Sequence, residues 1–170
     1  MDSILQEAHI EKEKLIKDCN TIFIGSVNQS GEPNASYAPT HIDEDCNFYI
    51  YISALAKHTK NILDTGKISF MLVEPKPQNI FAKKRITFNG QIKKIERKSE
   101  DFNTVMGDMR DKLGETIDMI RNMEDFSLIK ITPISGLLVY GFAKAFILTG
   151  KGLNEIKHLN DIGHTEKNEK

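Results

Sequence analysis

The 170-residue sequence contains no tryptophan and only two cysteines, Cys19 and Cys46. With no indole to stack on bases, no basic stripe and a formal net charge of −1, nucleic acid is not expected as a partner. The cysteines do not form a metal or redox motif, which suits a reducing cytosol, so we expect a cytoplasmic protein. No apolar run approaches the roughly 20 residues that a membrane helix needs, and no signal peptide is recognisable.

Several catalytic signatures are also missing. The sequence has no GxSxG, no P-loop, no HExxH and no GxGxxG followed by an acidic residue, so it does not support those chemistries. The five histidines do not cluster at zinc spacings. A metal would therefore have to bring most of its own ligands, as an iron porphyrin does.

Short apolar strands separated by turn residues make up most of the chain. We expect strands at 21–27, 36–42, 48–53, 67–73, 85–96, 126–132 and 137–148. The helices are predicted at 3–18, 54–64 and about 99–122. In the strand at 85–96 the alternation slips between Ile92 and Ile95, which indicates a bulge near Lys93.

These elements predict a mainly β fold with flanking α-helices, a six- to seven-stranded antiparallel barrel, because closure removes exposed edges. We expect one domain over 1–150, with an N-terminal helix and one long inserted helix, followed by a flexible C-terminal arm at 151–170. The strands at 48–53 and 67–73 are apolar on both faces. Such faces predict a homodimer that buries one of them. For the strand at 48–53 they also predict a second layer packed on the side away from the barrel interior.

A cationic cluster opens the strand at 85–96. Lys83, Lys84 and Arg85 are consecutive, and like charges repel unless an anion or carboxylates compensate them. One interpretation is an anion-binding rim beside an apolar cavity. The alternative is a solvated turn.

A second polar cluster follows the strand at 48–53. Ser53 ends that strand, and His58, Lys60 and Asn61 lie on the next helix, where they could hold a phosphate or carboxylate. Ordinary capping and a solvated helix face are the alternative.

Two single residues are candidates for a metal site. His164 lies on the glycine-containing tail, where a lone histidine is usually a surface residue but could ligate a metal. Asp125 follows the long predicted helix, where it is either a turn residue or a carboxylate that orients a metal-bound imidazole through its Nδ1–H.

Seven motifs carry a family resemblance: PNASYAP (33–39), ISALAKHTKN (52–61), FAKKRITF (81–88), EDF (124–126), GFAKAF (141–146), HL (158–159) and GH (163–164). With them the chain resembles the haem-utilisation proteins of the HutZ/HugZ type. These belong to the pyridoxamine 5′-phosphate oxidase-like, FMN-binding superfamily of split barrels.

The resemblance implies a homodimer of two split barrels with haem near the interface. It would make His164 the iron ligand, with Asp125 from the same or the other subunit as its hydrogen-bond partner. Arg85 would lie on the distal side of the haem, and Lys83 and Lys84 could pair with the propionates. His58 also matches a family position.

The leading interpretation is a dimeric, haem-binding enzyme that opens the porphyrin ring oxidatively and frees iron, with electrons from an external donor. One alternative is an FMN-binding oxidoreductase whose FMN phosphate is held by Ser53, Lys60, Asn61 and Arg85. A third possibility is a haem carrier or store without turnover. The segment 36–41 lacks the basic phosphate motif expected of pyridoxamine 5′-phosphate oxidase, which argues against that activity.

Overall fold

The computed structural model describes residues 3–77 and 79–159. Its helices are α1 (Ser3–Asp18), α2 (Lys57–Thr65), α3 (Glu100–Leu113) and α4 (Thr116–Ile120), with 3₁₀ turns η1 (Ile80–Ala82) and η2 (Lys151–Leu153). The strands are β1 (Thr21–Val27), β2 (Pro33–Pro39), β3 (His41–Ile42), β4 (Phe48–Ser53), β5 (Ile68–Val73), β6 (Arg85–Ile95), β7 (Phe126–Val139), β8 (Ala145–Thr149) and β9 (Glu155–His158). Among these residues no helix is long and apolar enough to cross a membrane.

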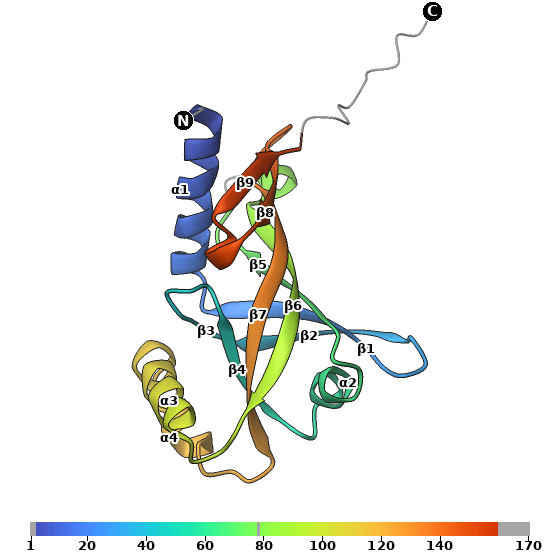
Figure 1. The fold of residues 1–170 in the computed structure, drawn as a ribbon, viewed down its shortest axis with the longest axis vertical. Coiled ribbons are helices and arrows are strands. Elements are labelled where there is room, and N and C mark those ends of the chain that lie inside the picture. Colours follow the sequence, from blue (N-terminus) through green and yellow to red (C-terminus); the bar gives the residue numbers. More distant parts are fainter. Residues whose placement is uncertain (1–2, 78, 160–170) are drawn as a thin grey trace, which may run out of the picture.

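All strand pairs are antiparallel, in the order β2-β1-β5-β6-β7-β4-β3, with β8 on β7 and β9 on β8. The sheet curls into a split barrel, so the mainly β fold class is confirmed, although with nine strands instead of six or seven. Figure 1 shows β6 and β7 running along the centre of the molecule. In this view α1 lies beside β8 and β9 at one end, and α3 and α4 lie at the other.

Two apolar clusters share strand β4. Phe48, Ile50 and Ile52 point into the barrel, where the rings of Phe48 and Phe70 pack edge to face. Tyr49 and Tyr51 point the other way, into a cluster with α3 and α4. The predicted second packed layer on this strand is therefore confirmed. Since α3 and α4 of the same chain supply that layer, this strand leaves no apolar face open for a partner subunit.

The long helix predicted at about 99–122 is two helices. α3 ends at Leu113, and Gly114 has φ 93° and ψ −175°, a conformation that breaks the helix before α4 begins at Thr116. The apolar spacing continues through Ile117 on the far side of the break, which is why the sequence pattern did not reveal it.

The predicted bulge near Lys93 is also misplaced. The register of β6 against β7 shifts between Asn89 and Gly90, opposite Pro133. A side chain at position 90 would put its Cβ 2.6 Å from Cγ2 of Ile131, so the close approach of the strands requires glycine here. The bulge lets β7 continue through Pro133, where the sequence predicted two separate strands.

Part of the segment predicted as a flexible C-terminal arm is ordered. Lys151–Leu153 form η2, and Glu155–His158 form β9, which extends the sheet beyond β8. Leu159 continues this edge, because its backbone N–H donates to the carbonyl of Ala145 over 2.8 Å. His164, the predicted iron ligand, lies outside the described residues.

Candidate functional site

The outer face of the sheet carries a row of mostly apolar side chains. The strand register aligns one residue from each of six strands, and their neighbours along each strand belong to the barrel core. The row consists of Tyr37, Phe23, Met71, Thr87, Leu137 and Ile147. Phe23 is 50% exposed and its ring lies 6.4 Å from that of Tyr37. This row is a continuous apolar surface with no charged side chain in it.

Arg85 lies beside this surface, at one end of the sheet. It pairs with Val73 on one side and Val139 on the other, and Val139 in turn pairs with Ala145. The guanidinium is half-buried, and its Nη1 donates to the carbonyl of Lys83 over 3.0 Å. Arg85 is therefore a fixed positive charge at the border of an apolar face.

The two lysines before Arg85 differ in their surroundings. The ammonium of Lys84 pairs with Glu11 on α1, and its backbone N–H donates to Oε1 of Glu74 over 2.8 Å. No ion pair of Lys83 occurs among the described residues. Of the predicted cationic rim, Arg85 and Lys83 remain open to an anion.

Three large apolar side chains project from the loops at the Arg85 end of the sheet. Ile80 and Phe81 form part of η1, just before the cationic cluster, and are 75% and 81% exposed. Phe142, in the turn between β7 and β8, is 76% exposed. Exposed aromatic side chains gathered around a cation are typical of a binding surface for a flat, partly apolar ligand.

At the opposite end of β7 the structure joins two candidates that the sequence assigned to different sites. The hydroxyl of Ser53 donates to Oδ2 of Asp125 over 2.6 Å, and the N–H of Ala54 donates to the Asp125 carbonyl over 2.7 Å. The hydroxyl oxygen of Ser53 also accepts the N–H of Leu55 at 3.1 Å. Asp125 is exposed yet held in a defined orientation.

Arg97 secures the segment that leads to Asp125. One guanidinium nitrogen donates to the carbonyl of Arg121 over 2.9 Å; the other lies 2.7 Å from the carbonyl of Met123 and 2.9 Å from that of Phe126. The second nitrogen also contacts the hydroxyl of Tyr51 at 3.0 Å. Nothing in the local sequence around Arg97 identified this role, because every partner is distant along the chain.

The predicted residues of α2 do not converge on one point. Asn61 is buried and its amide donates to Oγ of Ser26 over 3.2 Å, tying the helix to β1. Lys60 points to solvent and pairs with Asp64 at 3.0 Å. His58 is half-buried, and its Nε2 is buried without a hydrogen-bond partner among the described residues. Burial lowers the pKa of His58, because it disfavours the charged imidazolium.

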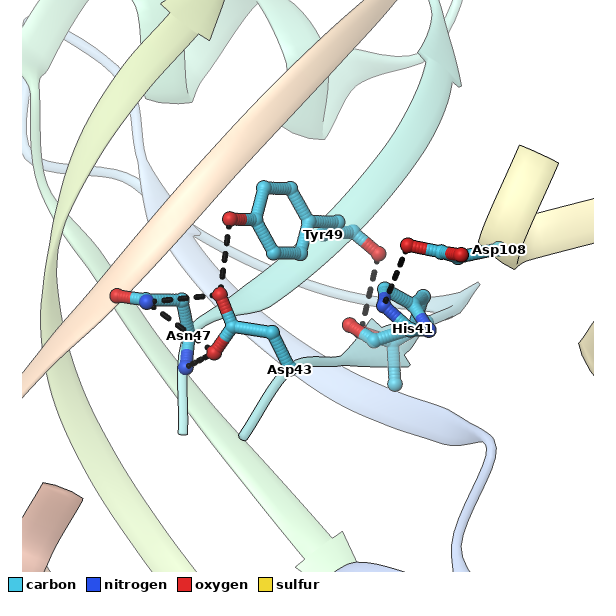
Figure 2. A network of polar contacts seen from close by, with 6 residues as sticks. His41, Asp43, Asn47, Tyr49 and Asp108 are labelled. Carbon is cyan, nitrogen blue, oxygen red and sulfur yellow. Dashed lines mark hydrogen bonds and ion pairs between the residues drawn. The ribbon is translucent and has the colours of Figure 1, made fainter. Parts of the chain in front are cut away.

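A further polar cluster lies between α3 and the sheet (Figure 2). The hydroxyl of Tyr49 donates to Oδ2 of Asp43 over 3.0 Å, and the amide of Asn47 donates to the same oxygen over 2.9 Å. Nε2 of His41 lies 3.9 Å from Asp108 on α3. Burial lowers the pKa of His41, which the Asp108 carboxylate partly offsets. His41, Asp43, Tyr49 and Asp108 line a cavity of about 540 Å³. None of them was a predicted site residue.

The two groups of candidates lie far apart within one chain. Asp125 directly precedes Phe126 at the start of β7, whereas Arg85 pairs with Val139 at its end. With a rise of about 3.3 Å per residue, a strand of this length separates them by roughly 40 Å. Figure 1 shows β7 spanning this length of the molecule. One chain therefore cannot bring Arg85 and Asp125 to the same small ligand.

Comparison with known proteins identifies the family. Residues 8–140 match the family model described as pyridoxamine 5′-phosphate oxidase. The chain belongs to this family. The HutZ protein of Vibrio cholerae, named a heme oxygenase, is 32% identical over 156 residues, which cover 91% of this chain and 88% of that protein. The predicted resemblance to HutZ-type proteins is thus confirmed.

Solved structures of family members agree with the fold. A crystal structure of Vibrio cholerae HutZ, described as a heme storage protein, has a TM-score of 0.70 and 30% identity over 74% of this chain and 89% of its own. ChuZ of Campylobacter jejuni has a TM-score of 0.84 and 26% identity over 95% of this chain and 66% of its own. The split barrel is shared along nearly the whole described chain.

Proposed function

We propose that this protein binds haem at the interface of a homodimer and degrades it oxidatively, releasing iron. The HutZ relative is named a heme oxygenase, which supports the reaction class. The observation that carries the proposal is the exposed apolar row beside Arg85, together with an oriented Asp125 at the far end of β7. Neither end alone supplies the residues that the reaction needs.

The side chains around Arg85 fit a porphyrin. A porphyrin is a flat apolar ring with two carboxylates, so it needs apolar contact area and a cation or two at the edge. Phe81 and Phe142 offer exposed rings, Val139 adds apolar surface, and Arg85 and Lys83 can pair with propionates or with an anionic oxygen ligand.

Two-fold symmetry can unite the separated ends. Two copies can pack their outer faces together about a two-fold axis that is perpendicular to the strands. The β7 strand of each chain then runs antiparallel to the β7 strand of its partner. The partner's Asp125 then approaches Arg85. This arrangement buries the apolar row of six side chains and gives two equivalent sites per dimer.

His164 is within reach of the same end. Arg85 pairs with Val139, Val139 pairs with Ala145, and the N–H of Leu159 donates to the carbonyl of Ala145. Leu159 is therefore three strand spacings from Arg85, which amounts to about 14 Å. The five residues from Leu159 to His164 can span at most about 18 Å. The chain length therefore permits the imidazole of His164 to meet a ligand beside Arg85.

Each residue has a defined task in this proposal. The imidazole of His164 would bind the iron, and the partner's Asp125 would accept its Nδ1–H, which would make it a stronger donor to the metal. Ser53 and Arg97 hold Asp125 in place. Arg85 would supply hydrogen-bond donors and a fixed positive charge to the bound group. Bound haem supplies the iron that activates oxygen, with electrons from an external donor.

The two alternatives differ in their support. The residues predicted to hold an FMN phosphate do not converge within one chain, because Asn61 faces Ser26, Lys60 pairs with Asp64 and Arg85 lies at the other end. FMN is therefore less supported than haem. A haem carrier or store remains the second candidate, because the HutZ crystal structure is described as that of a heme storage protein.

A haemin titration tests the proposal. We expect a Soret band that saturates at a defined stoichiometry, shifts in His164→Ala and is unchanged in the control His9→Ala. With ascorbate, oxygen and catalase, we expect the band to disappear at a rate that Arg85→Ala lowers and Arg110→Ala does not. An unchanged spectrum in His164→Ala would refute the ligand assignment. A stable Soret band under these conditions would favour the carrier.

A further inference from the structure

A cavity of about 350 Å³ lies between α1 and the segment that joins β5 to β6. Its lining includes Lys14 from α1, Lys76 and Asn79 from that segment, and Tyr140 from the turn after β7. The described residues that line it include neither Arg85 nor any residue of the outer apolar row. The cavity is therefore distinct from the face on which haem binding is proposed.

Tyr140 contributes a buried phenol to this lining. The residue is 7% exposed, and its hydroxyl has no hydrogen-bond partner among the described residues. A buried hydroxyl without a partner is unfavourable and uncommon. Burial, together with the nearby carboxylates of Glu7 and Glu11, raises the pKa of Tyr140 to about 12. At neutral pH the hydroxyl therefore keeps its proton and is available as a donor.

The other unpaired groups of the lining are donors as well. No ion pair of Lys14 or Lys76 occurs within the described part of the chain. Oδ1 of Asn79 accepts the backbone N–H of Phe81 over 2.9 Å, so the side-chain amide nitrogen is the group that remains for a ligand. Two ammoniums, an amide and a phenol thus line one cavity, and all of them need an acceptor.

The carboxylates near the cavity are already engaged. Glu11 pairs with the ammonium of Lys84, and Oε1 of Glu74 accepts the backbone N–H of Lys84 over 2.8 Å. Glu7 pairs with Lys144 over 2.7 Å. Within the described lining Glu74 is the one acidic residue, so the two unpaired ammoniums exceed it by one positive charge. An anion in the cavity neutralises this excess.

We propose that this cavity binds a small oxyanion of the phosphate class. The lining offers donors from three separate segments, and phosphate has more acceptor oxygens to receive them than a carboxylate has. Lysine side chains commonly bind phosphate as point charges. The anion supplies the acceptor that the Tyr140 hydroxyl lacks, and it links α1 to the segment before β6. The inference does not depend on haem as the ligand of the outer face.

The test is a titration of the full-length protein with inorganic phosphate, followed by amide NMR shifts at an ionic strength held constant with sodium chloride. We expect saturable shifts at Asn79 and Tyr140. The dissociation constant should rise about 10-fold in Lys14→Gln and in Tyr140→Phe, because each removes a hydrogen bond to a charged group. Lys17→Gln is the matched control, because Lys17 is exposed on the same helix and outside the described lining. Equal losses in Lys14→Gln and Lys17→Gln, or shifts that do not saturate, would overturn the inference.

Two further titrations test the class of ligand. Acetate should bind at least about 10-fold more weakly than phosphate, and equal affinities would overturn the assignment to phosphate. Saturating phosphate should leave the dissociation constant for haemin unchanged. Competition between phosphate and haemin would show that the cavity receives a haem propionate, which would overturn this inference while haem binding stands. Without phosphate, Tyr140→Phe should melt no lower than the parent, because it removes no hydrogen bond within the described chain, so its weaker binding does not come from unfolding.

Discussion

Truncation of Phe23 to alanine should weaken the proposed dimer without unfolding the monomer. Phe23 lies within the apolar row, paired with Tyr37 on one side and Met71 on the other. Its ring is half exposed in the single chain, so the removal opens no cavity in the barrel core. The substitution should therefore weaken the association of the two subunits and leave the stability of the single chain nearly unchanged.

The magnitude follows from the exposed area. An aromatic side chain carries roughly 200 Å², and 50% exposure leaves about 100 Å² for a partner to cover. At about 25 cal/mol per Å², covering it contributes some 2.5 kcal/mol, of which alanine loses about 2. Two-fold symmetry doubles the effect to about 4 kcal/mol, or roughly a 1000-fold increase in the dimer dissociation constant.

Sedimentation equilibrium over a range of concentrations measures this constant directly. Ile10→Ala is the matched control, because Ile10 is 58% exposed on α1, away from the outer sheet face. Circular dichroism and urea unfolding should show that both variants stay folded. An unchanged dissociation constant in Phe23→Ala, or a parent protein that is monomeric at all concentrations, would refute the proposed interface.

Three further predictions concern stability. Burial lowers the pKa values of His41 and His58 in the folded state, so the unfolded chain binds more protons below about pH 6.5. Urea unfolding should therefore show that the free energy of unfolding falls from about pH 7.5 to about pH 5.5, and that it falls less in His41→Gln. A fall in His41→Gln equal to that of the parent protein would contradict this. Arg97→Met removes the charged hydrogen bonds to the carbonyls of Arg121, Met123 and Phe126, and should cost about 3 kcal/mol of unfolding free energy. A loss under about 1 kcal/mol would show that these contacts are weak. Gly90→Ala should lower the free energy of unfolding by about 2 kcal/mol, because the added Cβ clashes with Ile131. Gly107→Ala in α3 has open space around its Cβ and should raise that free energy by about 1 kcal/mol. Similar effects of the two substitutions would contradict the close approach of the strands at the bulge.

The fold was largely predictable because strand alternation is local. β1, β4, β5 and β6 were predicted to within a residue or two, since their apolar spacing and flanking turns lie within the segment itself. The errors came from features that depend on a neighbouring strand or on backbone geometry. Pro133 lies within β7 next to a bulge in that strand, where Ile134 has no partner in β6. The break at Gly114 leaves the apolar spacing of the helix intact.

The candidate site was less predictable because its contacts are distant along the chain. Ser53 and Asp125 are 72 residues apart yet share a hydrogen bond, and no local pattern joins them. Arg97 resembles any other surface arginine until the carbonyls of Arg121, Met123 and Phe126 are seen around its guanidinium. Sequence motifs predicted candidate residues for a site, but could not tell which end of the sheet each occupies.

A mixed-dimer experiment tests most directly whether the site is shared between two subunits. Arg85→Ala and Asp125→Ala are each expected to impair haem degradation as homodimers. In a heterodimer of the two, one site receives both altered residues and the other receives both natural ones. The account predicts that a 1:1 mixture, after subunit exchange, regains activity in about a quarter of its sites. No recovery, with heterodimer formation verified by mass spectrometry, would contradict a site built from Arg85 of one chain and Asp125 of the other.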